Sequence, residues 1–257
     1  MKIKLVLSGS GVLYPVHVGA VIRLLETGYE IEEVIGTSGG SIVAAGIASG
    51  LEFGKDELTK LVKSIVPGKL LDFGLWSSLT KWGLYKGNKI QKIFSQHFAS
   101  TLGGTQIPLH IVTTCLNKKS VRVFSSDTDP DFPTALAVRA SISVPGIFIP
   151  VKIDNEIYVD GGVMANFMID YFGADPSVIG LRIGGSGLDT PINDVIQYGG
   201  ASIESAVAAA ESARSSSNKI ISLYSKFGSF DFKIGEKEIV EMIEEGYSSV
   251  VRWEKGL

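Results

Sequence analysis

The chain has 257 residues, an apolar fraction of 45%, a charged fraction of 20% and a net charge of -3, as expected for an ordinary globular domain with a substantial core. The slight acidic excess argues against a nucleic-acid partner, because binding phosphates needs an excess of Lys and Arg. Its one cysteine, Cys115, cannot form an internal disulfide, and its three histidines do not have metal-ligand spacing, so we expect no metal site.

The N-terminal segment predicts a buried strand rather than a targeting signal. Its apolar run at residues 5–7 is too short for the hydrophobic region of a signal peptide, and glycines follow at once. No uncharged apolar stretch approaches the roughly 18 residues that a membrane-spanning helix needs. We therefore expect a cytoplasmic protein without a transmembrane helix, although export without a signal stays open.

Residues 1–50 predict a strand, a glycine loop, a helix, a second strand, a tight turn and a second helix. The expected strands lie at residues 3–7 and 33–35. The first helix is expected to begin near Pro15, because apolar residues recur at helical spacing from there toward Gly28. Two strands joined by a helix in this way favour a parallel pair and an α/β fold.

The rest of the chain shows neither repeats nor a linker, so we expect a single domain over residues 1–257. Its motifs lie in a core of about residues 3–185, and a mostly helical C-terminal part follows at about 190–257. A hairpin is expected around Asp154 and Asn155, because apolar residues alternate beside this turn-forming pair. The other expected elements are a helix capped by Asn88, strands at 108–114, 121–124 and 178–183, a short helix after a loop at 125–133, and C-terminal helices around 192–216 and 239–250.

A candidate nucleophile lies directly after the second expected strand. Residues 36–40 read Gly-Thr-Ser-Gly-Gly and fit the pattern G-x-S-x-G, with Ser38 at its centre. A nucleophilic serine needs a sharp turn between strand and helix, so that its hydroxyl projects and the helix N-terminus faces developing negative charge. Small neighbours are required in such a turn, which Gly36, Gly39 and Gly40 supply. A βα turn without catalytic function remains the alternative.

A glycine loop, Ser8-Gly9-Ser10-Gly11, follows the first expected strand. A dinucleotide fingerprint would require a third glycine at position 14, where the chain has Tyr14, and the Gly-Lys-Ser/Thr of a P-loop is missing. Backbone N–H groups of such a loop can instead stabilise the oxyanion of an acyl-transfer reaction, which suits a nucleophile on the next strand. A tight turn without a ligand stays open.

The candidate bases are three histidines and one aspartate. His17, His97 and His110 lie on a helix, on an amphipathic helix and in an apolar strand, where structural roles are more common than catalytic ones. Asp160 precedes Gly161 and Gly162 and ends an apolar run, so burial would raise its pKa toward that of a useful base. Taken alone, however, this Asp-Gly-Gly is better explained as a turn.

Together these motifs resemble the patatin-like phospholipase family. The resemblance runs in order from about residue 3 to 185, and it also includes Ala140-Ser141-Ile142-Ser143-Val144-Pro145, Leu84-Tyr85-Lys86-Gly87 and Asn166. It implies a three-layer α/β/α fold with a central, mostly parallel sheet, related to cytosolic phospholipase A. It also implies hydrolysis of fatty acyl esters by a Ser38–Asp160 dyad without histidine and without a metal or organic cofactor. The backbone N–H groups of the implied oxyanion hole belong to Gly9, Ser10, Gly11 and Val12.

The chain departs from the family pattern just after the glycine loop. Leu13 and Tyr14 stand where the family usually has Arg or Lys followed by Gly, and Met168 stands where proline is frequent. The missing cation leaves the head group open, so a neutral lipid, a lysolipid or a simple ester could suit the site. An acyltransferase, a thioesterase or a catalytically silent lipid-binding protein on the same fold remain alternatives, whereas Tyr14 weakens a nucleotide-binding function.

Residues 69–86 are a candidate for contact with a lipid surface. Trp76 and Trp82 lie among leucines in this segment, and lysines flank them. Aromatic rings beside cations are typical of the headgroup boundary of a membrane. We therefore expect a peripheral membrane contact here, with the alternative that these side chains belong to the core or line an acyl tunnel.

Overall fold

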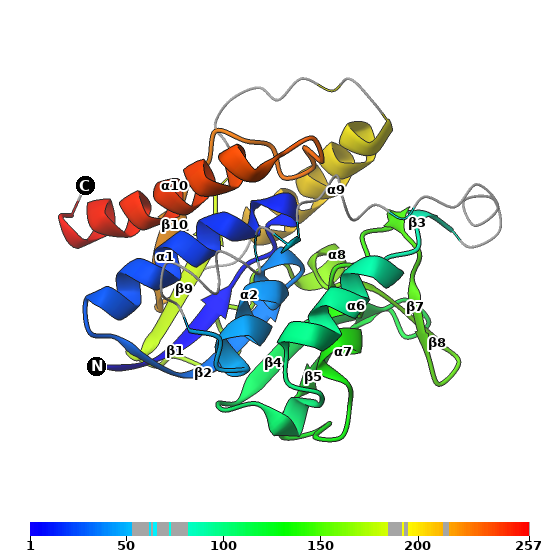
Figure 1. Ribbon diagram of the computed structural model, residues 1–257, viewed down its shortest axis with the longest axis horizontal. Helices are drawn as coiled ribbons and strands as arrows, with labels where there is room; N and C mark the ends of the chain where they lie inside the picture. Colours follow the sequence, from blue (N-terminus) through cyan, green and yellow to red (C-terminus); the bar gives the residue numbers. More distant parts are fainter. Residues whose placement is uncertain are drawn as a thin grey trace.

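The computed structural model describes residues 1–52, 62, 64–65, 72, 82–184, 192, 195–212 and 216–256. Its strands are β1 Lys2–Leu7, β2 Glu30–Thr37, β3 Gly83–Tyr85, β4 Leu109–Cys115, β5 Ser120–Ser125, β6 Gly146–Phe148, β7 Val151–Ile153, β8 Glu156–Asp160, β9 Val178–Ile183 and β10 Lys219–Leu223. The central sheet has the order β10-β9-β1-β2-β4-β8-β7, with β5 also paired to β4 (Figure 1). Strands β3 and β6 form a separate pair.

The central sheet is parallel from β10 to β4 and antiparallel beyond it. β1 pairs in parallel with both β2 and β9, and β2 pairs in parallel with β4. The neighbours β5 and β8 run antiparallel to β4, and β7 and β8 form the predicted hairpin. The structure thus confirms the expected α/β class, the mostly parallel sheet and the parallel pairing of the first two strands.

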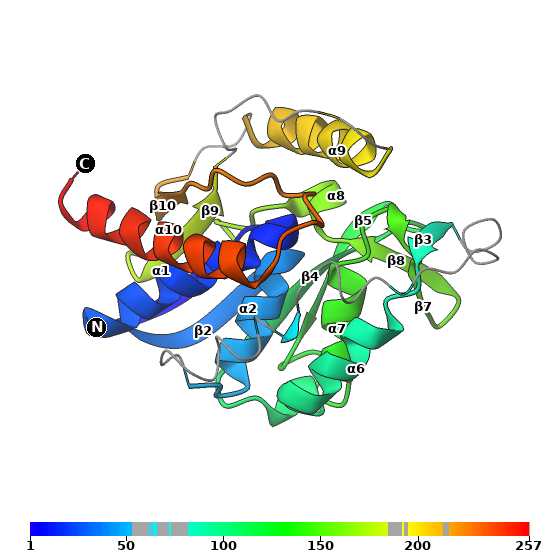
Figure 2. The same cartoon turned by 45° about the horizontal axis from the view of Figure 1, so that its top comes forward.

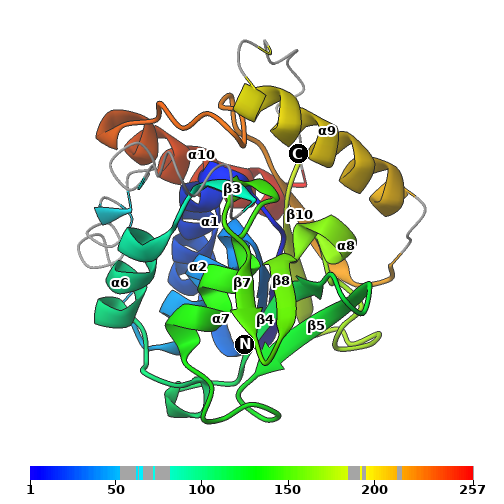
Figure 3. The ribbon, with the colours of Figure 1, turned by 90° about the vertical axis from the view of Figure 1, so that its right-hand side faces the viewer.

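Helices cover both faces of the sheet, which gives the expected three layers (Figure 3). The helices are α1 Tyr14–Glu26, α2 Gly39–Ala48, α6 Asn88–His97, α7 Thr134–Ser141, α8 Gly162–Ala165, α9 Val195–Ser212 and α10 Glu236–Glu254, with 3-10 turns at Gly11–Leu13 and Leu102–Gly104. α1, α2, α6, α7 and α10 lie on one face, whereas α8 and α9 lie on the other. Among the described helices, none has both the length and the apolar composition needed to cross a membrane.

Helix α10 lies alongside α1 on the first face of the sheet (Figures 1 and 2). The two backbones touch at a pair of glycines. A β-carbon added to Gly19 would lie 1.8 Å from the Ile243 carbonyl oxygen, and one added to Gly246 would lie 1.9 Å from the Val16 carbonyl oxygen. Because no side chain fits between the helices at these points, the last helix packs tightly against the first.

Two local features differ from the expectations. The C-terminal part contains the expected helices, but between them β10 pairs in parallel with β9 and extends the central sheet. The expected cap Asn88 is instead the first residue of α6, and the cap position is taken by Gly87 in a left-handed conformation, with φ 74°. The Asp72 carboxylate accepts hydrogen bonds from the backbone N–H groups of Gly87 and Asn88, at 2.6 and 2.9 Å, and so caps this helix from a distant part of the chain.

Candidate active site

Strand β4 brings the ends of two other strands together. Thr37, the last residue of β2, pairs with Val112, and Asp160, the last residue of β8, pairs with the next residue, Thr113. β5 pairs along β4 from His110 to Cys115, so β2 and β8 share the other edge of β4 and meet end to end. Because Ser38 directly follows Thr37, this register places it beside Asp160 although the two are 122 residues apart in sequence.

Ser38 lies on the predicted sharp turn between β2 and α2. Its φ of 49° and ψ of -125° are an unfavourable conformation for a residue with a side chain. The flanking glycines allow the turn to pack closely. A β-carbon added to Gly36 would lie 2.6 Å from the Gly40 carbonyl oxygen, and one added to Gly39 would lie 2.6 Å from the Gly11 carbonyl oxygen. One added to Gly40 would lie 2.4 Å from the Ser8 carbonyl oxygen. The turn is therefore a strained elbow that requires glycine on both sides, as a nucleophilic serine would need.

Hydrogen bonds with two other serines hold this strained conformation. The Ser38 N–H donates to Ser141 Oγ at 2.9 Å, and the Ser141 hydroxyl donates to the Val112 carbonyl oxygen at 2.6 Å. On the other side, the Ser41 hydroxyl donates to the Ser38 carbonyl oxygen at 2.6 Å. Both backbone polar groups of Ser38 are thus satisfied, which keeps the elbow in place.

Ser38 and Asp160 form a buried hydrogen-bonded pair. The Ser38 hydroxyl donates to Asp160 Oδ2 at 2.5 Å, and the Gly162 N–H donates to Asp160 Oδ1 at 2.7 Å. The Asp160 N–H donates to the Ser143 carbonyl oxygen at 3.0 Å, which fixes the backbone of the aspartate. Burial raises the pKa of Asp160 to about 7, and the hydrogen bonds from Ser38 and Gly162 offset only part of this rise. Such a carboxylate can accept a proton near neutral pH.

The glycine loop lies beside the elbow, but its four N–H groups are not equivalent. The Gly9 N–H donates to the Asn166 carbonyl oxygen at 2.9 Å, and the Val12 N–H donates to the Ser229 carbonyl oxygen at 2.9 Å. The N–H groups of Ser10 and Gly11 make no hydrogen bond within the part of the chain that the structure describes. Ser10 has φ -146° and Gly11 has φ 53°, and such alternation of sign turns successive N–H groups toward one point.

The predicted Asp-Gly-Gly motif completes the site. A β-carbon at Gly161 would lie 2.4 Å from the Val112 carbonyl oxygen, so this glycine allows the chain to pass next to β4. Gly162 begins α8, and its N–H is the donor to Asp160. Asn166 follows α8 and packs onto the glycine loop, since a β-carbon at Gly9 would lie 2.1 Å from its Oδ1.

The histidines lie outside the Ser38–Asp160 pair. Neither Ser38 nor Asp160 hydrogen-bonds to a histidine in the described part of the chain. His17 is buried and its Nε2 donates to the Ser8 carbonyl oxygen at 3.0 Å, beneath the glycine loop. Burial lowers the pKa of His17 to about 4, so it is neutral and supports the loop. His97 is exposed at the end of α6.

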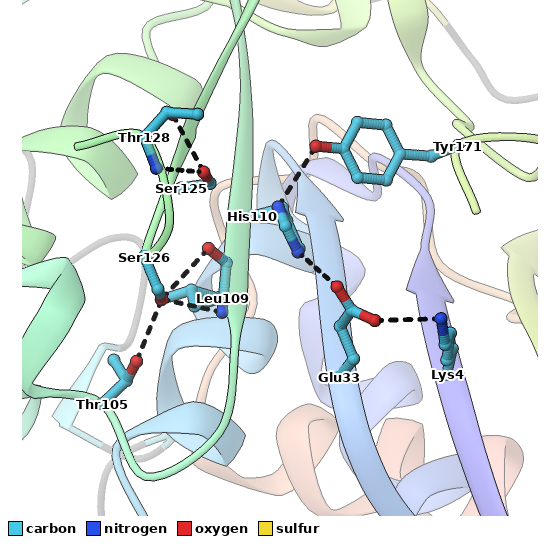
Figure 4. A network of polar contacts seen from close by, with 9 residues as sticks. All are labelled: Lys4, Glu33, Thr105, Leu109, His110, Ser125, Ser126, Thr128 and Tyr171. Carbon is cyan, nitrogen blue, oxygen red and sulfur yellow. Dashed lines mark hydrogen bonds and ion pairs between the residues drawn. The ribbon is translucent and has the colours of Figure 1, made fainter. Parts of the chain in front are cut away.

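His110 belongs to a separate polar network on β1, β2 and β4 (Figure 4). Its Nε2 lies 2.8 Å from Glu33 Oε1, and its Nδ1 lies 3.2 Å from the Tyr171 hydroxyl. The other oxygen of Glu33 forms an ion pair with Lys4 at 3.3 Å. Lys4, Glu33 and His110 lie in the first halves of their strands, whereas Ser38, Asp160 and the glycine loop lie at the carboxyl ends of theirs. The network therefore joins neighbouring strands away from the dyad.

The family assignment rests on the whole set of motifs. The chain matches the family described as patatin-like phospholipase over residues 5–172, which include the glycine loop, the elbow and both dyad residues. It belongs to this family.

Relatives of this patatin-like chain include uncharacterized proteins of several organisms. YqhO of Bacillus subtilis is 34% identical over 210 residues, which cover 71% of this chain and 72% of YqhO. A protein of Acanthamoeba polyphaga mimivirus is 33% identical over 184 residues, which cover 66% of this chain and 61% of that protein. An NTE family protein of Mycobacterium tuberculosis is 28% identical, and the matched region covers 63% of this chain and 43% of the relative.

The crystal structure of VipD from Legionella pneumophila has the same fold, with a TM-score of 0.59 at 15% identity. The superposition covers 97% of this chain and 66% of VipD. The likeness confirms the predicted patatin-like α/β fold.

The patatin-like site opens into two cavities that share Ser38. The larger, of about 900 Å³, is lined by both dyad residues and by parts of the glycine loop, α9 and residues 227–233. It also contains charged side chains, among them Arg182, Glu204 and Lys233. The smaller, of about 60 Å³, has almost entirely apolar walls and contacts Ser38, Gly39 and the glycine loop. Within the described residues, no group of three or more His, Cys, Asp or Glu could hold a metal ion.

The departures from the family pattern lie at these cavities. Leu13 lines the larger cavity and Tyr14 lines the smaller one. No cation therefore projects from this part of the glycine loop, and Arg182 and Lys233 carry positive charge in the larger cavity instead. Within the candidate membrane segment at residues 69–86, residues 69–71 and 73–81, which include Trp76, lie outside the described residues. Its other tryptophan, Trp82, is 68% exposed.

Sequence reasoning missed the residues that hold the dyad in place. It noted Ser141 and Ser143 only as part of a family motif, whereas they bind the backbones of Ser38 and Asp160. It also missed Arg139, which is 2% exposed and donates to the carbonyl oxygens of Lys86 and Ile149 at 2.8 and 2.9 Å. An arginine between Val138 and Ala140 on a short apolar helix was the available signal, because a buried cation needs several acceptors.

Proposed function

We propose that this protein is a serine acyl hydrolase that cleaves acyl esters of lipids, with Ser38 as nucleophile and Asp160 as general base. The observation that carries the proposal is the 2.5 Å hydrogen bond from Ser38 Oγ to a buried carboxylate whose pKa is raised to about 7. A carboxylate with an ordinary pKa would be too weak a base for a serine hydroxyl, and this burial makes it stronger.

The reaction proceeds in two acyl transfers. Asp160 accepts the hydroxyl proton as Ser38 Oγ attacks the ester carbonyl carbon, and the N–H groups of Ser10 and Gly11 stabilise the oxyanion. The C–O bond to the alcohol then breaks, and protonated Asp160 returns the proton to the leaving oxygen. Water attacks the acyl-enzyme with Asp160 again as base, which releases the carboxylic acid and restores Ser38.

Two of the four N–H groups predicted for the oxyanion hole have another task in this proposal. The Gly9 and Val12 N–H groups hold the loop by donating to the Asn166 and Ser229 carbonyl oxygens. Donors that are already aimed at the reacting oxygen need no reorganisation during the reaction, so fixing the loop at both ends contributes to catalysis. The two unpaired N–H groups lie between these anchors.

The larger cavity suits the alcohol part of the ester. Its volume of about 900 Å³ lies within the usual range of ligand pockets, which is about 300 to 1,000 Å³. The mixed charges of Arg182, Glu204 and Lys233 favour a polar leaving group over a purely hydrocarbon one.

The test compares wild-type protein with Ser38→Ala, Asp160→Asn and the double variant on p-nitrophenyl esters and a phospholipid panel. Each single substitution should lower kcat by at least about a thousandfold, and the double variant should be no worse, because the two residues act as one unit. Ser95→Ala, which removes an exposed serine on α6, is the matched control and should keep wild-type activity.

Labelling with a fluorophosphonate gives an independent readout, since it should modify Ser38 and fail with Ser38→Ala. A Ser38→Ala protein that retains wild-type turnover would refute the proposal. A wild type that is labelled but transfers its acyl group to an added alcohol faster than to water would point instead to an acyltransferase.

A further inference from the structure

We propose that the smaller cavity beside Ser38 is the acyl site and that Tyr14 forms its floor, which restricts the enzyme to esters of short-chain acids. The inference rests on the proposed function and names the substrate class of that site. It predicts an ester with a small acyl group and a larger, polar alcohol.

The position of the cavity supports its use by the acyl chain. Ser38 lines both cavities, so an ester attacked by Ser38 can place its two halves in different spaces. The smaller space suits hydrocarbon, because burying methylene groups against apolar walls is favourable. Its apolar walls come from α2, α6, β6 and the segments after α7 and β10, through Ile42, Ile90, Ile142, Val144, Phe148, Phe230 and Phe232.

The size of the cavity sets the length of the chain. Its volume is about 60 Å³. An engineered cavity of about 150 Å³ in another protein holds one benzene molecule, so about 60 Å³ accommodates a chain of roughly two to four carbons. Longer chains would have to push the lining side chains apart, since well-packed protein interiors resist insertion of extra methylene groups.

Tyr14 is a fixed part of the cavity lining. Its side chain is 3% exposed, and its hydroxyl donates to the Ile65 carbonyl oxygen at 2.7 Å. Rotating the ring away would leave this buried hydroxyl and carbonyl without their hydrogen bond, which is unfavourable. The backbone is equally constrained, because Tyr14 begins α1 and is followed by Pro15. The ring therefore cannot easily move aside for a longer chain.

The experiment measures kcat/KM on p-nitrophenyl acetate, butyrate, octanoate and dodecanoate below their micelle concentrations. Wild-type kcat/KM should be highest for acetate or butyrate and fall by at least about tenfold for octanoate. Each methylene group that the cavity buries should raise kcat/KM about fourfold, whereas each one that it excludes should leave kcat/KM unchanged or lower it. Tyr14→Gly extends the cavity and should raise the octanoate-to-butyrate ratio by at least about tenfold.

Two further variants separate cavity size from loss of folding. Ile42→Ala enlarges the same cavity from α2 by a smaller volume and should raise the ratio to a lesser extent. Tyr224→Gly removes an exposed tyrosine that does not line the cavity and should keep the wild-type ratio. Thermal unfolding shows whether each variant is folded, and a ratio of rates within one protein is insensitive to the folded fraction.

The outcomes distinguish this inference from the proposed function. Equal kcat/KM for butyrate and dodecanoate in the wild type would overturn the short-chain restriction and leave the hydrolase standing. A folded Tyr14→Gly or Ile42→Ala variant with the wild-type ratio would overturn the role of this cavity. Failure to cleave any ester or to react with a fluorophosphonate would refute the hydrolase and the inference together.

Discussion

Asp160→Asn is expected to stabilise the fold at pH values above neutrality while it abolishes activity. Burial raises the pKa of Asp160 from 3.8 to about 7, so the folded protein binds this proton more tightly than the unfolded chain does. The associated stability is fully present below about pH 4 and is lost as the pH rises through about 7. The rise in pKa corresponds to about 4 kcal/mol, a large part of the 5 to 15 kcal/mol that holds a typical domain together.

Asparagine avoids this loss because it carries no charge. Its amide oxygen can still accept the Gly162 N–H, and its amide nitrogen can donate to Ser38 Oγ, so the local geometry is preserved. The variant should therefore exceed the wild type in free energy of unfolding by up to about 4 kcal/mol at pH 8, and the difference should shrink toward about pH 4.

Urea unfolding of both proteins across this pH range measures the difference. Asp175→Asn is the matched control. Hydrogen bonds from the Ser177 N–H and hydroxyl lower the pKa of Asp175, so this substitution should lower the free energy of unfolding at pH 8 instead of raising it. A wild type that is at least as stable as Asp160→Asn at pH 8, or a difference that does not depend on pH, would refute the raised pKa. The physical reason for Asp160 to act as a base would then be lost.

The same pKa predicts that wild-type kcat/KM rises about tenfold per pH unit below about pH 7 and is level above it. A kcat/KM that does not change with pH below about 7 would contradict the role of Asp160 as general base. Ser141→Ala removes the acceptor of the Ser38 N–H and should lower kcat by about ten- to a hundredfold; an unchanged kcat would show that the elbow needs no such support. Gly246→Ala places a methyl group 1.9 Å from the Val16 carbonyl oxygen. It should lower the free energy of unfolding by about 3 kcal/mol in urea. Gly199→Ala on α9 places its methyl group in open space and should be neutral or slightly stabilising. If Gly199→Ala and Gly246→Ala changed the free energy of unfolding equally, the tight packing of α10 against α1 would be refuted.

Features that depend on neighbouring residues in the sequence could be predicted. The elbow around Ser38 follows from glycine spacing between an apolar strand and a helix, and the hairpin at Asp154 and Asn155 follows from two residues that tolerate positive φ, here 47° and 66°. The glycine loop was also predicted from its place after the first strand. Which of its N–H groups stay free depends on Asn166 and Ser229, and no local pattern relates these residues to the loop.

Features that depend on strand pairing could not be predicted from local pattern. β10 is short, and its alternation of buried Ile221 and Leu223 is a weak signal beside two long helices. The cap of α6 comes from Asp72, which lies outside the helix and far along the chain. Asp160 alone was better explained as a turn residue, because its role depends on its distance from Ser38, which is set by β4.

The dyad combines two unfavourable features, and one segment offsets both. Ser38 has a strained backbone, and Asp160 is a carboxylate buried where its charge is poorly solvated. Ser141 accepts the N–H of Ser38, and two residues later the Ser143 carbonyl oxygen accepts the N–H of Asp160. Arg139 lies beneath and donates to the Ser143 hydroxyl at 2.5 Å, so the segment is itself anchored. β4 sets the meeting point of β2 and β8, and this segment binds the ends of both strands. The 2.5 Å contact between Ser38 and Asp160 therefore follows from backbone pairing. In the proposed mechanism, this backbone pairing is what allows an aspartate on an antiparallel strand to act as base without an intervening histidine.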